Sequence, residues 1–158
     1  MTPADNPFSF NSFGMDSAMH ILILTADSIG RMENIMAKTA IVTGASRGIG
    51  RSIARRLASD GHSVVVNYAG NVKDAEETVS AIKSAGGNAV AIRGDVSQPN
   101  DVTELFAKAE QAFGPIEVVV NDAGIMPLSP IAKSDVGTFD KVVAINLRGT
   151  FLVLAQAA

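Results

Sequence analysis

Short runs of apolar residues recur along the chain after residue 36, and each run has the length of a β-strand. Valine and isoleucine dominate these runs, and both residues favour strands. The runs at residues 64–66 and 118–120 contain no polar residue, as is typical of parallel strands buried on both faces. The pattern predicts four strands, at residues 39–43, 63–67, 88–93 and 116–120.

Between these runs the apolar positions follow a helical period. We expect helices at residues 47–59, 72–85 and 99–113, and a long one from about residue 134 to the chain end. The apolar stripes of the first three helices comprise Ile49, Ile53 and Leu57; Ala75, Val79 and Ile82; and Val102, Leu105, Phe106, Ala109 and Phe113. Gly61 is expected to end the first helix. Ser97 is expected to cap the third helix, with Pro99 in its first turn.

Alternating strands and helices indicate right-handed crossovers and a parallel sheet covered on both faces. In a doubly wound α/β sheet the fourth strand lies beside the first, on the side away from the second. The crevice at the carboxyl ends of strands one and four is therefore the expected binding site.

The first 36 residues have a different composition. Residues 1–13 are rich in Asn, Ser, Pro and Phe, and the apolar run at 21–24 is too short for a signal-peptide core. The acidic residues Asp5 and Asp16 argue against a transit peptide. Met36 resembles a natural translation start. We expect residues 1–36 to be a flexible leader, or a start assigned too early, before a domain at 37–158. A leader with a function of its own is the alternative.

The composition narrows the class of protein. A chain of 158 residues with 47% hydrophobic and 18% charged residues suits one globular domain. The net charge of −3 gives no reason to expect a nucleic acid or a membrane as partner. The absence of cysteine excludes disulfides and thiolate metal sites, so we expect no metal and a cytoplasmic location.

The segment T-G-A-S-R-G-I-G, residues 43–50, joins the first strand to the first helix. Gly44 would permit a sharp turn, Gly48 would let backbone N–H groups approach a diphosphate, and Gly50 would let the helix pack closely on the sheet. The helix dipole would favour an anion there. A tight turn that binds nothing is the alternative. A triphosphatase loop fits poorly, because Arg51 rather than lysine follows the last glycine.

Four segments in order resemble the short-chain dehydrogenase/reductase family, and the resemblance covers residues 36–158. They are Thr43-Gly44-x-x-x-Gly48-Ile49-Gly50, Asp95-Val96, Asn121-Asp122-Ala123-Gly124 and Asn146. Within the family the amino-acid sequence is most similar to 3-oxoacyl-acyl-carrier-protein reductases. The resemblance implies an α/β doubly wound parallel sheet (a Rossmann fold), truncated after the fourth strand and its helix. It also implies hydride transfer between a nicotinamide cofactor and a small ketone, aldehyde or alcohol, in a homo-oligomer when complete.

The resemblance assigns cofactor binding to Gly44, Ser46, Arg47, Gly48, Ile49, Gly50, Asn67, Tyr68, Asp95, Val96, Asn121, Ala123 and Gly124. It assigns a catalytic role to Asn146, which would help to hold a proton-relay water. Simpler interpretations stay open: Asp95 could favour a helix start, Asn121 could cap a turn, and Asn146 could be an ordinary polar residue. Asp122 replaces the family's second asparagine, and a carboxylate accepts hydrogen bonds without donating any.

The charges near strand two favour NADP(H) over NAD. An enzyme that selects NAD usually ends this strand with a carboxylate, whereas here the strand ends in Asn67-Tyr68. Arg47 lies in the glycine loop at a helix N-terminus, where a cation is disfavoured unless an anion is near. Family members with a basic residue here bind the 2′-phosphate with it. The alternative is a merely solvated Arg47.

The family's catalytic serine and its tyrosine–lysine pair have no counterpart in this chain. The single tyrosine is Tyr68, and Val72 rather than lysine lies four residues later. In the family those residues come after the position of Ala158. We therefore expect a chain that binds cofactor but is inactive alone, with a strand edge at 116–120 and surplus apolar helix surface. A nucleotide-binding module completed by a partner, or a non-functional remnant, are the alternatives.

Overall fold

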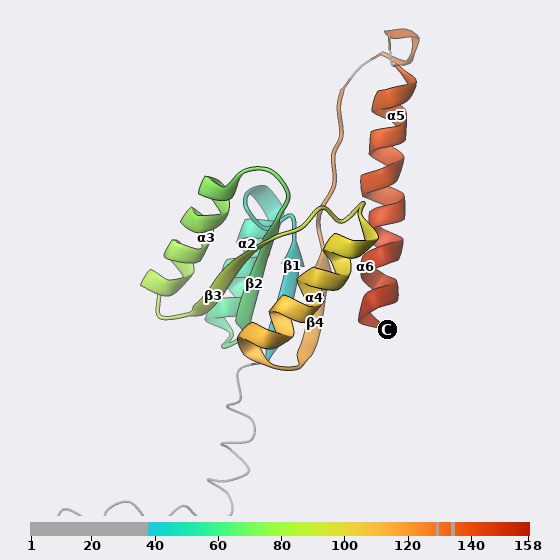
Figure 1. Cartoon of the computed structure of the whole chain (residues 1–158). Helices are drawn as coiled ribbons and strands as arrows, with labels where there is room; N and C mark the ends of the chain where they lie inside the picture. The colour runs from blue at the N-terminus through green and yellow to red at the C-terminus, as the bar shows by residue number, and fades with distance from the viewer. Residues whose placement is uncertain (1–37, 129, 134) are drawn as a thin grey trace, which may run out of the picture. The chain divides into compact units, whose positions relative to one another are not determined.

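Four parallel strands form the centre of the molecule. The computed structural model describes residues 38–128, 130–133 and 135–158, so the expected leader at 1–36 lies outside the described residues. The strands are β1 (Thr39–Thr43), β2 (Ser63–Tyr68), β3 (Asn88–Arg93) and β4 (Ile116–Asn121). Their order is β3-β2-β1-β4, with every pair parallel (Figure 1). The expected position of the fourth strand beside the first is confirmed.

Helices cover both faces of this sheet (Figure 1). The helices α2 (Gly48–Ser59) and α3 (Val72–Ser84) pack on one face, and α4 (Pro99–Phe113) and α6 (Thr150–Ala157) on the other. A short 3₁₀ turn, η1 (Ile131–Lys133), precedes α5 (Val136–Val142), which continues through the π-helical segment η2 (Val143–Gly149) into α6. None of the helices described here is long and apolar enough to cross a membrane.

Alternating strand residues divide the core into two clusters. Ala40 and Val42 point toward α2 and α3, whereas Ile41 between them points toward α4 and α6. The same alternation separates Val64 and Val66 from Val65. Because β1 and β2 are covered on both faces, their aliphatic residues are completely buried. The β4 strand is only half-buried, since in the described residues it pairs with β1 alone.

The stripe predicted for α2 is not the face that packs most closely. Gly50, Ala54 and Ala58 are its buried residues, while Ile49 is 71% exposed. Ile53 and Leu57 lie at the border of the core. Both triplets repeat every four residues, but only the small side chains allow the helix axis to approach the sheet closely.

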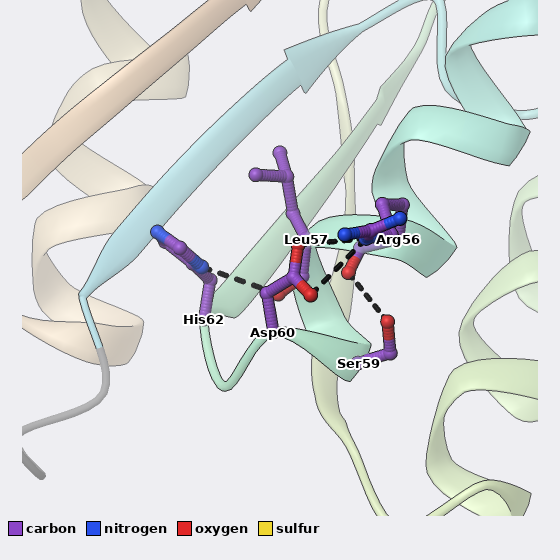
Figure 2. Close-up of polar contacts among 5 residues, drawn as sticks. All are labelled: Arg56, Leu57, Ser59, Asp60 and His62. Atoms are coloured by element: carbon purple, nitrogen blue, oxygen red, sulfur yellow. Dashed lines mark hydrogen bonds and ion pairs between the residues drawn. The ribbon is translucent and has the colours of Figure 1, made fainter.

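The C-terminal end of α2 is closed by local polar contacts (Figure 2). Gly61 has a φ of +95°, the left-handed conformation that ends many helices. Arg56 Nε donates to both carboxylate oxygens of Asp60 at 3.1 and 2.8 Å, and Ser59 Oγ donates to the Arg56 carbonyl at 2.7 Å. His62 Nδ1 lies 3.2 Å from the Leu57 carbonyl. The expected end of this helix is therefore observed, at the sheet edge opposite the strands' carboxyl ends.

One expected helix cap and one expected helix start are wrong by one or two residues, whereas α4 begins at Pro99 as expected. Gln98, not Ser97, is the N-cap of α4, because the Ser97 hydroxyl donates to Asp95 Oδ1 at 2.8 Å instead. The last helix begins at Val136 rather than near 134, with Asp135 as its N-cap. The Thr138 backbone N–H and hydroxyl both donate to the Asp135 carboxylate at 2.8 Å. The hydrogen bond from the Thr138 hydroxyl, and to a smaller extent that from its N–H, lowers the pKa of Asp135 below its usual value.

Candidate functional site

The three glycines between β1 and α2 differ in what they make possible. Gly44 has a φ of +65°, and a Cβ on it would lie 2.9 Å from Ala123 Cα. Gly48 has a φ of +59° with open space in front of it. A Cβ on Gly50 would lie 2.8 Å from the Gly44 carbonyl oxygen and from Asp122 Oδ2. The missing Cβ of Gly50 therefore lets α2 approach the loops after β1 and β4 closely, as well as the sheet.

The glycine loop is anchored by residues that the motif does not contain. Arg51 Nε donates to the Ser46 carbonyl at 3.0 Å, and Thr78 Oγ1 donates to the same oxygen at 3.2 Å. Arg51 also reaches the Asp74 carbonyl at 3.3 Å, which joins the loop to α3. This position, which in a triphosphatase loop would carry the phosphate-binding lysine, here fixes the backbone of the loop.

Asn67 links the ends of three strands. Its side chain is 1% exposed, and its amide donates to the carbonyls of Ile92 and Gly94 at 3.3 and 3.0 Å. Its Oδ1 accepts from the Gly44 N–H at 3.4 Å, and its carbonyl accepts from Ala45 N at 2.9 Å. Its side-chain amide and its backbone carbonyl are thus engaged within the protein, which makes Asn67 a support for the glycine loop more than a free cofactor ligand.

The hydroxyl of Thr43 organises the loop after β4. Thr43 Oγ1 donates to Asn121 Oδ1 at 3.0 Å and accepts the N–H groups of Asp122 and Ala123, both at 3.1 Å. Asn121 in turn donates to Thr150 Oγ1 at 2.9 Å. Asn121 therefore ties β1, β4 and α6 together, and it does not line the cleft.

Asn146 holds the same loop from the helix side. Its Oδ1 accepts the Ile125 N–H at 2.9 Å, and its Nδ2 donates to the Ile125 carbonyl at 2.8 Å. The side chain is exposed rather than buried, contrary to the expectation of an amide inside an apolar helix surface. In this arrangement its amide is committed to the backbone of residue 125, and its catalytic role stays a prediction.

Asp95 and Val96 follow β3 at the same edge. Asp95 Oδ1 accepts the N–H and the hydroxyl of Ser97 at 2.9 and 2.8 Å, and the Asp95 N–H donates to Asp101 Oδ2 at 2.9 Å. Gly149 packs tightly here, because a Cβ on it would lie 2.8 Å from Val96 Cγ2. Asp95 thus shapes the turn into α4 while it also lines the cleft.

A cleft of about 850 Å³ lies at the carboxyl ends of the strands. Every residue predicted to bind cofactor lines it except Gly50 and Asn121, and Asn146 lines it too. Residues that the sequence interpretation missed complete the lining: Ala69, Gly70, Gly94, Asp122, Ile125, Met126, Lys141 and Ile145. Lys141 and Ile145 lie one helical turn apart, and only the fold shows that their helix faces this cleft.

The N-terminus of α2 opens into the cleft. Arg47 is its N-cap residue in extended conformation, no side chain caps the helix, and its first turn contains no acidic residue. Gly48 and Ile49 of this first turn line the cleft. The N–H groups of such a turn have no partner within the helix, and a diphosphate suits both them and the helix dipole. The residues present therefore fit a dinucleotide.

Comparisons with known proteins agree with this geometry. The family model described as short chain dehydrogenase matches residues 38–158. The chain is 40% identical over 124 residues to a trihydroxynaphthalene reductase of Colletotrichum orbiculare, covering 78% of this chain and 44% of the relative. It is 43% identical over 116 residues to a 3-oxoacyl-(acyl-carrier-protein) reductase of Staphylococcus epidermidis, covering 73% and 48%.

A solved structure shows the same fold. The dehydrogenase/reductase from Sinorhizobium meliloti 1021 superposes with a TM-score of 0.73 at 38% identity, over 81% of this chain and 52% of that one. The chain thus spans about half the length of the relatives that it matches. The family match, the identities and the shared fold together show that this chain belongs to the short-chain dehydrogenase/reductase family.

Proposed function

We propose that this chain is the NADP(H)-binding part of a short-chain oxidoreductase that interconverts a ketone or aldehyde and an alcohol. The uncapped N-terminus of α2, open to the cleft beside Gly48, is the observation that carries the proposal. When bound, the cofactor supplies or accepts the hydride. The chain's own residues would bind and orient it: the first-turn N–H groups would hold the diphosphate, and the bonds of Asn146 to Ile125 position the opposite wall.

The preference for NADP(H) over NAD is argued from charge. Arg47 lines the cleft, is exposed, and caps α2 with its backbone only. The side chain at the end of β2 that could have been a carboxylate is the buried amide of Asn67. A ribose 2′-phosphate near Arg47 would gain a charge-assisted hydrogen bond and meet no acid from β2.

We expect this chain alone to bind the cofactor without catalysing the reaction. Tyr68 is the single tyrosine of the sequence, and it lies at the end of β2 with Val72 four residues later. A lysine near the tyrosine is what lowers the pKa of the tyrosine in the family's mechanism. The serine, tyrosine and lysine of the complete enzyme are therefore proposed to be outside this sequence.

A module that binds a nucleotide without catalysis, completed by a partner, is the second candidate. Large apolar side chains on α5, η2 and α6 favour it, since Phe139, Leu147 and Phe151 are 64%, 68% and 69% exposed. Such surface is typical of contact with another chain. We propose a second copy of the subunit as that contact. Reduction of ketones by the purified chain with NADPH would contradict the proposal that the proton donor lies outside this sequence.

Calorimetric titration with NADPH and NADH tests the cofactor proposal. Wild type should bind NADPH more tightly, and Arg47→Ala should lose roughly tenfold for NADPH but little for NADH, as removal of one charged hydrogen bond predicts. Arg55→Ala is the matched control, because Arg55 is exposed on the same helix and lies outside the cleft. Equal losses for both cofactors after Arg47→Ala would reject the 2′-phosphate assignment.

A further inference from the structure

A second, smaller cavity adjoins the cofactor cleft on the side of α5. Its volume is about 420 Å³, and it shares with the cleft Arg47, Lys141 and residues 124–126. Pro127 and Thr138 complete its lining. Because these walls are common to both cavities, one ligand can extend from the cleft into the smaller space.

The charges of the two cavities differ. The cleft is lined by two cations, Arg47 and Lys141, and by two carboxylates, Asp95 and Asp122. The smaller cavity is lined by the same two cations and by neither carboxylate. In the part of the chain that the structure describes, the ion pairs are formed by other cations. Two like charges that face a small space repel each other, so an anion between them would be favoured.

The position of Lys141 is set by its helix. Thr138, Lys141 and Ile145 follow the spacing of one helical face, and each lines one or both cavities. The Asp135 cap fixes the start of α5, which lies five residues before Lys141. The bonds between Asn146 and Ile125 hold the next turn against the loop that forms the other wall. Lys141 is therefore held at the cleft from both directions along the helix.

We propose that Arg47 and Lys141 form one anion subsite that takes a phosphate group of the bound dinucleotide. The inference rests on the proposed function, and it adds a specificity-determining residue that none of the sequence motifs contains. The phosphate is either the ribose 2′-phosphate or the diphosphate bridge, since both present the same chemistry to an ammonium group. A lysine serves here as a point charge on a flexible stem.

The test is titration of the full chain and its variants with NADPH and with NADH. Lys141→Gln should weaken binding roughly three- to tenfold, as for a partly exposed charge contact to phosphate. Lys141→Arg should retain most of the affinity. Lys133→Gln removes the same charge from an exposed position outside both cavities and should bind like wild type. Far-UV circular dichroism of each variant verifies that it is folded.

Ionic strength provides a readout that a structural role of Lys141 would not change. The difference between wild type and Lys141→Gln should shrink from ~0.01 M to ~1 M salt, as the Debye length falls from about 30 Å to about 3 Å. A loss for NADPH alone assigns the 2′-phosphate, and equal losses for both cofactors assign the diphosphate. Arg47→Gln combined with Lys141→Gln should lose less than the product of the single losses if one phosphate bridges the two.

Three results would overturn the proposal. They are wild-type affinity in Lys141→Gln, an equal loss in Lys133→Gln, and a loss that does not depend on salt. If wild type binds NADPH and Lys141→Gln binds it equally well, the subsite is refuted and the proposed function stands. If folded wild type binds neither cofactor, both are refuted.

Discussion

The buried hydroxyl of Thr43 connects the stability of the sheet to the shape of the cofactor cleft, and Thr43→Val removes it without changing the side chain's volume much. Thr43 is 0% exposed, and its hydroxyl makes three hydrogen bonds of 3.0–3.1 Å, to Asn121, Asp122 and Ala123. A typical net hydrogen bond contributes about 1 kcal/mol, and a buried group left unpaired costs about 1–3 kcal/mol. The groups of Asn121, Asp122 and Ala123 that lose this partner are only half-buried and can be partly hydrated. We therefore expect Thr43→Val to lower the free energy of unfolding by about 3 kcal/mol.

Urea unfolding followed by circular dichroism measures this loss, and Thr39→Val is the matched control. Thr39 lies on the same strand, is 1% exposed, and uses its hydroxyl only to donate to the carbonyls of Phe113 and Gly114. Thr39→Val should cost about 1 kcal/mol and leave NADPH binding unchanged. Thr43→Val should also weaken NADPH binding, because residues 122–124 line the cleft. Equal destabilisation by both variants, with equal affinity for NADPH, would refute the reasoning.

Three further predictions address the glycines, the strand ends and the last helix. Gly50→Ala should destabilise the chain by more than about 2 kcal/mol, because its Cβ would meet backbone at 2.8 Å, whereas Gly48→Ala should cost only about 1 kcal/mol of backbone strain; urea unfolding compares the two. Asn67→Asp should lower the free energy of unfolding and weaken the binding of both NADPH and NADH, since a carboxylate cannot donate hydrogen bonds to the carbonyls of Ile92 and Gly94 as the amide does. Unchanged affinity for NADPH would contradict this prediction. The pKa of Asp135 is lowered, so its capping contribution is present above its usual pKa and is lost as pH falls through the lowered value. An NMR titration of the Thr138 amide should report that low pKa, and Thr138→Ala should raise it.

The strands β2 and β4 were predictable because burial on both faces requires unbroken apolar runs, and the strand order was predictable from the doubly wound arrangement. The end of α2 at Gly61 was predictable as well, since glycine readily adopts the left-handed conformation that ends many helices, and Gly61 has a φ of +95°. The packed face of α2 was not predictable from hydrophobicity. Gly50, Ala54 and Ala58 pack because they are small, and a hydrophobic pattern gives more weight to the larger Ile49.

The sequence predicted that the motif residues meet at the carboxyl ends of the strands. Which of them line the cleft and which of them support the loops is shown only by the structure. Asn67 and Asn121 have the side chains of ligands, yet hydrogen bonds to backbone or to other side chains engage both. Arg51 carries no motif signal, because its role depends on contacts with Ser46 and with Asp74 on α3. Lys141 carries none either, because only the fold shows that it lines the cleft. The π-helical segment that lies near Val96 also lacks a sequence signal, apart from Gly149 at the close approach.

The central claim is that the backbone N–H groups at the start of α2 bind the diphosphate of a dinucleotide. The most direct measurement is an NMR titration of the isotope-labelled chain with NADPH, in which the amide signals of Gly48 and Ile49 are followed. The account predicts that these two signals shift in a saturable way, while Gly61 and Gly86 at the far ends of α2 and α3 do not. Unchanged Gly48 and Ile49 signals in folded protein, or shifts confined to the far ends of those helices, would contradict it.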